Sequence, residues 1–133
     1  MAARVSVPFS RTMNREQVTL TGKCVGAAAA NPTGLKGIGI TSVTRSNTGL
    51  YTITLADKYA ALLMAKFTVI DSTGTKQYTV TMSAVDVVSA KTINITTASA
   101  AFGSAPAVAN LATTETLLFE LTLSNTTQLP NGN

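Results

Sequence analysis

The chain has 133 residues, a length that fits one domain and can bury a hydrophobic core without disulfides or metals. Hydrophobic residues make up 45% of it and charged residues only 12%, against about a quarter in an average domain, which excludes a disordered chain and predicts a surface of small polar side chains. The net charge is +4, of which residues 1–23 contribute +3, so the rest is nearly neutral and lacks the basic surface that nucleic acid binding needs.

Residues 1–16 have no clean periodicity, and Pro8, Asn14 and scattered arginines predict an extended N-terminal arm rather than a helix. Apolar side chains alternate with others in part of the arm, so a short strand can form where a partner supplies a sheet edge. The candidate partner-binding residues of the arm are Arg4, Val5, Val7, Phe9, Arg11 and Arg15. A frayed terminus is the alternative interpretation.

The N-terminal segment also lacks the continuous apolar core that a signal peptide needs. The longest apolar stretch, residues 60–65, is too short to span a bilayer. We therefore expect a soluble chain that is made in the cytoplasm and does not insert into a membrane.

From residue 17 onward the apolar residues recur at every second position, which is typical of strands that bury one face. In chain order, strands are expected at residues 18–25, 38–43, 51–55, 62–70, 78–88, 93–95 and 117–123. Turns are expected at 46–49 and 71–75, and loops at 26–35 and 98–113. A change of parity near residues 41–42 predicts a β-bulge.

About seven strands without a convincing helix predict an all-β fold, an antiparallel β-sandwich or jelly-roll-like single domain. We place this domain at residues 17–127, between the arm and a polar C-terminal tail at 128–133. The 23 threonines agree with it, because threonine suits half-exposed strand faces. The predicted core residues are Tyr51, Ile53, Leu55, Tyr78, Val80, Met82, Leu117, Phe119, Leu121 and Leu123.

The chain has no histidine, which removes the commonest general base near neutral pH, histidine-activated nucleophiles and histidine-containing zinc sites. The single cysteine, Cys24, lies in an alternating apolar stretch and is expected to be a buried, inert thiol. Glu115 and Glu120 are five positions apart on one expected strand, so their carboxylates should lie on opposite faces. We therefore expect no enzymatic activity, no cofactor and no metal site.

Two short motifs also have structural interpretations. Residues 34–39 resemble a phosphate-binding loop only superficially, because strand-like residues follow instead of a helix. Their glycines instead predict the start of a strand or a close approach between backbones. Residues 57–59 form a polar group that is typical of a corner after a strand.

Two stretches carry a resemblance to a known class of protein. Residues 43–59 (VTRSNTGLYTITLADKY) and 118–125 (LFELTLSN), together about a fifth of the chain, resemble small virion proteins of tailed bacteriophages. They are most similar to capsid decoration (cement) proteins and to small β-domains of fibres. The resemblance implies a homotrimer on the outer capsid surface that braces neighbouring subunits of the major capsid protein, and it carries over no catalytic residue.

We therefore expect a structural virion protein whose partners are the major capsid protein and other copies of itself, with no nucleic acid and no membrane among them. The alternative is a tail, collar or fibre component whose loops bind host-surface glycan. The scarcity of aromatic residues, three Tyr, four Phe and no Trp, weighs against that alternative because aromatic rings usually supply sugar-stacking faces.

Overall fold

The structure, a computed structural model, describes residues 17–125 and forms two antiparallel sheets packed as a sandwich. The all-β sandwich expected from the sequence is therefore confirmed, whereas the six candidate residues of the arm and the 128–133 tail lie outside the described residues. The strands are β1 (Gln17–Val25), β2 (Thr33–Lys36), β3 (Ile40–Asn47), β4 (Leu50–Leu55), β5 (Ala61–Asp71), β6 (Lys76–Asp86), β7 (Thr92–Ala101), β8 (Ala107–Val108) and β9 (Glu115–Ser124).

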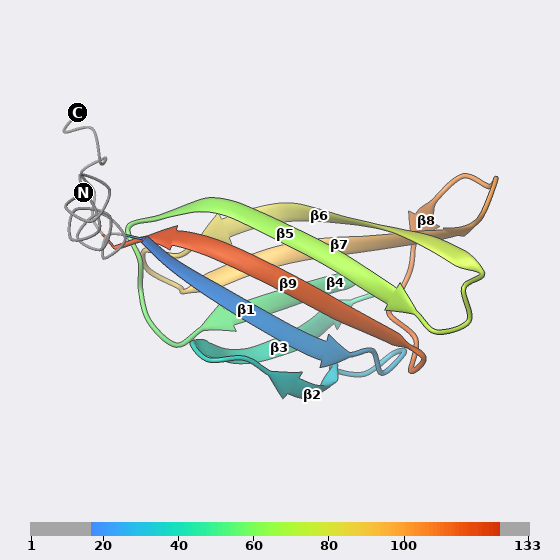
Figure 1. Cartoon of the computed structure of the whole chain (residues 1–133), viewed down its shortest axis with the longest axis horizontal. Coiled ribbons are helices and arrows are strands. Elements are labelled where there is room, and N and C mark those ends of the chain that lie inside the picture. The colour runs from blue at the N-terminus through green and yellow to red at the C-terminus, as the bar shows by residue number, and fades with distance from the viewer. Residues whose placement is uncertain (1–16, 126–133) are drawn as a thin grey trace, which may run out of the picture.

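One sheet has the strand order β2-β1-β9-β5, and the other has the order β3-β4-β7-β6, with β8 paired to β7. Figure 1 shows β5 and β6 along one long side of the sandwich and β2 and β3 along the other. These four strands are the edges of their sheets, so each of them leaves one row of backbone groups without a strand partner among residues 17–125.

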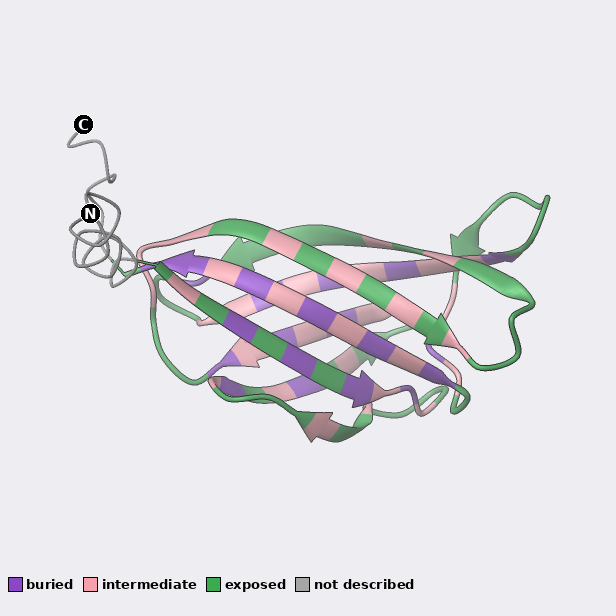
Figure 2. Ribbon diagram, in the orientation of Figure 1, coloured by how far each residue is buried: buried purple, intermediate pink, exposed green. Residues whose placement is uncertain are grey.

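The core lies between the sheets and follows from the alternation of apolar residues. Along β9 and β4, every second side chain is buried, which Figure 2 shows as alternating colours on β9. Of the ten residues predicted for the core, seven are buried: Tyr51, Ile53, Leu55, Leu117, Phe119, Leu121 and Leu123. Cys24 is also buried, as its position in β1 predicts.

The prediction for β6 is partly wrong. Tyr78 and Val80 are only partly buried, and Met82 is 39% exposed. The pairing of β6 with β7 shifts between Met82 and Ala84, so the inward-facing parity changes there and Val87 becomes buried instead. The strand also lies at an open side of the sandwich, where fewer neighbours cover it.

Two predicted loops contain strands. The 26–35 loop leads into β2, and the 98–113 loop begins inside β7 and contains β8. The buried positions of β7 after Ile95 are Thr97 and Ala100, and these small or polar residues carry little hydrophobic signal. Thr97 satisfies its hydroxyl by donating to the carbonyl oxygen of Ala109, at 2.6 Å.

The predicted hairpin of β3 and β4 is confirmed, with a register shift between Ile40 and Ser42 where the bulge was expected. Gly49 adopts a left-handed φ of 67° in its tight turn. Ile38, however, precedes β3 and is 91% exposed, so its assignment to this strand is wrong. The positive φ values of Gly37 and Gly39 on either side break the extended chain at that point.

Tyr51 holds the segment that leads into β9 through a hydrogen bond. Its buried hydroxyl accepts a hydrogen bond from the backbone N–H of Leu111 at 2.8 Å. Tyr51→Phe leaves this N–H unpaired, and we expect it to lower the free energy of unfolding by about 1–3 kcal/mol. Urea denaturation measures the change, with Tyr59→Phe as the control, because the Tyr59 hydroxyl has no hydrogen-bond partner within residues 17–125. Equal midpoints for the two variants would contradict the prediction.

Candidate functional site

The described part of the chain offers little reactive chemistry. Residues 17–125 contain no group of three or more Cys, Asp or Glu side chains placed to hold a metal ion. Burial raises the pKa of the Cys24 thiol to about 11, so this group stays protonated and unreactive near neutral pH. The same residues contain no helix that is long and apolar enough to cross a membrane.

The two glutamates of β9 do lie apart, as expected. Glu120 lies half-buried on the outer face of its sheet, whereas Glu115 is 1% exposed and faces the interior. The Glu115 carboxylate accepts hydrogen bonds from the Tyr78 hydroxyl and from the backbone N–H of Ala112. Since Tyr78 belongs to β6 and Glu115 to β9, this buried carboxylate links the two sheets, a role that the sequence did not reveal.

Asp71 organises the turn between β5 and β6. Its carboxylate accepts hydrogen bonds from the Thr73 hydroxyl at 2.7 Å and from the backbone N–H groups of Thr73, Thr75 and Lys76 at 3.0–3.2 Å. The Thr73 hydroxyl and then these backbone groups hold the pKa of Asp71 below its ordinary value. Asp71 is therefore committed to the turn that was predicted at residues 71–75.

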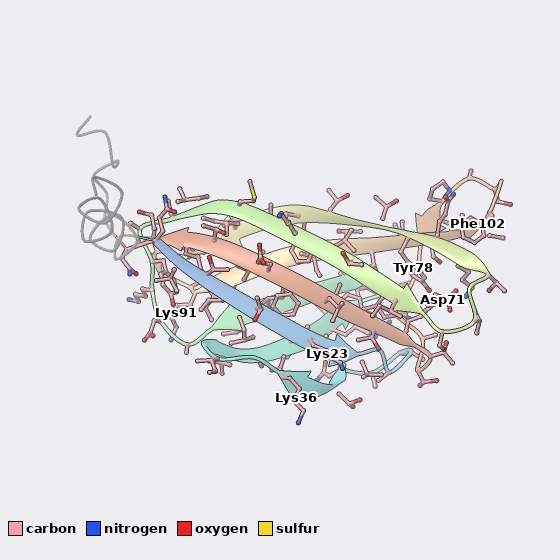
Figure 3. All side chains as sticks on the ribbon, in the orientation of Figure 1. Lys23, Lys36, Asp71, Tyr78, Lys91 and Phe102 are labelled. Atoms are coloured by element: carbon pink, nitrogen blue, oxygen red, sulfur yellow. The ribbon has the colours of Figure 1, made fainter. Side chains whose placement is uncertain are left out.

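A basic groove of about 530 Å³ lies on the outer face of the β2-β1-β9-β5 sheet. Lys23 on β1 and Lys36 on β2 are directly opposite each other and both exposed, and Figure 3 labels them at this edge of the sheet. Lys66 and Glu120 also line the groove. None of the three lysines has an ion-pair partner within residues 17–125, and like charges opposite each other destabilise a sheet.

The glycines of the 34–39 motif help to form this groove. A Cβ atom at Gly37 would lie 2.6 Å from the carbonyl oxygen of Thr21, which is closer than any side chain allows. The close approach between backbones predicted for this motif is therefore confirmed, and it brings the chain after Lys36 against β1.

The second surface is the open side of the sandwich between β5 and β6. These two strands have 11 residues each, the longest in the described part of the chain, and each pairs with only one strand there. Figure 2 shows exposed positions along both. Large apolar residues are exposed on these strands or next to them: Leu63, Met64, Ile70, Met82, Val85 and Val88. Apolar residues exposed in such a group are typical of a surface that contacts protein.

An aromatic cavity of about 410 Å³ lies at one end of this open side. Tyr78 lines it, as does Phe102, which is 66% exposed in the loop after β7. Asp71 and Gln77 supply polar groups at the same place, and Figure 3 shows Asp71, Tyr78 and Phe102 at this end. The combination of an exposed ring with polar groups is one that sugars or apolar peptide side chains can contact.

Neither surface was among the sites expected from the sequence, which placed all six partner-binding residues in the arm, outside the described residues. The signal for the open side was present: residues 77–85 carry no charge over nine positions of high strand propensity. What the sequence did not show is that this strand lies at an edge. A comparison of the chain with protein-family models, with curated proteins and with solved structures finds no match.

Proposed function

We propose that this chain is a structural virion protein without enzymatic activity, a capsid decoration protein that braces neighbouring major capsid subunits on the outer capsid surface as a homotrimer. The observation that carries the protein-contact role is the open side, where two long strand edges and a group of exposed apolar residues occur together. The resemblance of residues 43–59 and 118–125 to phage decoration proteins points to the capsid as the partner.

The mechanism follows from mass action. A protein that binds the assembled shell but not free subunits stabilises the shell by a free energy that grows with the logarithm of the ratio of its concentration to its dissociation constant. The basic groove supports contact with an acidic surface, since Lys23, Lys36 and Lys66 lack ion-pair partners within the described residues. A partner carboxylate there would relieve the repulsion between Lys23 and Lys36.

The test is co-sedimentation of the purified chain with expanded, DNA-free capsids assembled from the major capsid protein of the same phage. We expect saturable binding, a higher capsid melting temperature and weaker binding as salt rises, because surface ion pairs are screened. Unassembled major capsid protein is the control, and we expect it not to bind. Absence of binding to expanded capsids, at concentrations that saturate other decoration proteins, would contradict the proposed function.

A tail, collar or fibre component that binds host-surface glycan is the second candidate, and the aromatic cavity favours it. Phe102 offers an exposed ring face, and Gln77 lies in the same cavity. The Asp71 carboxylate, however, is already engaged by Thr73, Thr75 and Lys76, so it has little capacity left for sugar hydroxyls. Binding to immobilised host polysaccharide that Phe102→Ala abolishes, without binding to capsids, would support this candidate over the first.

A further inference from the structure

The four edges of the sandwich are not equally protected against pairing with another chain. β2 is only four residues long and ends at Lys36, and β3 has register shifts at both ends and carries Arg45. Short strands and bulges are among the usual means of blocking an edge. β5 is long and carries Lys66 near its middle, exposed on the outer sheet face, so its backbone edge stays accessible to a strand without a charge at the same place. β6 has no charge between Lys76 and Asp86, so it is the edge that a covering strand fits best.

The geometry of the open side identifies a strand that can cover β6. β5 and β6 are joined by the turn at 72–75 and run in opposite directions, as Figure 1 shows. Their joined ends are level, because the backbone N–H of Lys76 donates to the Asp71 carboxylate at 3.1 Å. When a second copy is generated by rotation about an axis parallel to the strands, its strand ends keep the same height along that axis. Such a rotation brings β5 of one copy beside β6 of the next in antiparallel orientation and in full overlap.

This pairing has a defined register. With Asp71 of one copy opposite Lys76 of the next, Lys66 lies opposite Thr81, five residues along each strand and before the bulge of either. Paired residues also match in exposure. Lys66 and Thr81 are both exposed and outward, whereas the next pair, Phe67 and Val80, is half-buried in both strands and packs towards the core.

We propose that the open side between β5 and β6 is the surface on which copies of this chain assemble, with β5 of each copy pairing antiparallel to β6 of the next around a closed axis parallel to the strands. The inference rests on the self-association in the proposed function and adds the surface and the register. A closed ring pairs every such edge. It leaves the basic groove, on the outer sheet face, open to the capsid.

The test uses the full chain and a matched pair of variants. Thr81 and Thr44 are both exposed on edge strands, and each lies opposite a threonine, Thr96 and Thr52 respectively. Thr81→Lys places a second positive charge opposite Lys66 of the neighbouring copy, so we expect the dissociation constant of the assembly to rise about tenfold or more. Thr44→Lys on the other side of the sandwich should leave it unchanged. Mass by light scattering and analytical ultracentrifugation at tens of micromolar measure both.

A charge of the opposite sign tests the register itself. Thr81→Glu places a negative charge opposite Lys66 of the neighbouring copy, so we expect this variant to keep the assembly that Thr81→Lys weakens. A monomeric wild-type chain, an unaffected Thr81→Lys assembly, or equal weakening by Thr44→Lys would each overturn the proposal. So would a Thr81→Lys chain that assembles normally but no longer binds capsids, because the open side would then belong to the capsid contact. A monomer that still decorates capsids overturns this inference and leaves the proposed function standing.

Discussion

Replacing Phe119 by Ala is expected to lower the free energy of unfolding by about 3–5 kcal/mol, a large part of the stability of a domain of this size. Phe119 is 4% exposed at the centre of β9, between β1 and β5. Its ring covers Gly22, where a Cβ atom would lie 2.2 Å from the ring, and it contacts the ring of Phe67 at a centroid distance of 6.3 Å. Neither neighbour can fill the space that the ring leaves, because Gly22 has no side chain and Phe67 is held on the adjacent strand.

Phe102→Ala is the matched control, since the same atoms are removed from a ring that is 66% exposed. We expect it to change stability by no more than about 0.5 kcal/mol. Urea denaturation measures both variants, and Phe119→Leu, with an expected cost under about 1.5 kcal/mol, keeps the comparison measurable if the alanine variant does not fold. Equal urea midpoints for Phe119→Ala and Phe102→Ala would contradict the placement of Phe119 in the core.

The fold was predictable where large apolar residues alternate. β4 and β9 each bury every second side chain, and most residues between the buried ones are polar, with Leu50 and Leu118 as the apolar exceptions, so the period of two is clear. The β3–β4 turn carried the same kind of local information, because Gly49 supplies the positive φ of a tight turn. Both are properties of a single strand or a single turn, so they can be read from neighbouring residues in the sequence.

The strands that the sequence missed bury small or polar residues instead. Thr97 is fully buried in β7 because Ala109, twelve residues away, accepts its hydrogen bond. Arg45 likewise gains its role from distant partners: its guanidinium donates to the backbone oxygen of Ala29 and to the side-chain oxygen of Asn110. These partners come together only when the two sheets pack, so no local sequence pattern predicts them.

The candidate surfaces were hidden for the same reason. Whether a strand is central or at an edge depends on which strands it pairs with, so the uncharged stretch at 77–85 was visible while its exposure was not. The basic groove also arises from pairing, because Lys23 and Lys36 are thirteen positions apart in the chain and meet through the β1–β2 register. Charge and hydrophobicity can be read at each position of the sequence, whereas the open side and the basic groove depend on which strands pair.

Removing residues 2–16 is expected to leave the sandwich folded and to lower its affinity for expanded capsids. The described sandwich does not depend on these residues for its pairing, since β1 begins at Gln17 and is matched along its whole length by β9. If the arm adds a strand to a capsid subunit, several backbone hydrogen bonds of about 0.5–1.5 kcal/mol each, less the cost of ordering the arm, are lost. We expect the dissociation constant for capsids to rise about tenfold or more.

Two further variants separate the contributions of the arm. Replacing Arg4, Arg11 and Arg15 by Ala should slow association and reduce its salt dependence while keeping most of the occupancy at saturation, because charges at the rim mainly steer the encounter. Val7→Ser with Phe9→Ser keeps the charge but removes apolar contacts, so it should approach the effect of the truncation. Thermal melting of each variant alone serves as the folding control. Capsid occupancy and melting temperature that both match the full-length chain would assign the arm no part in binding, and the capsid contact would then rest on the described surfaces of the sandwich.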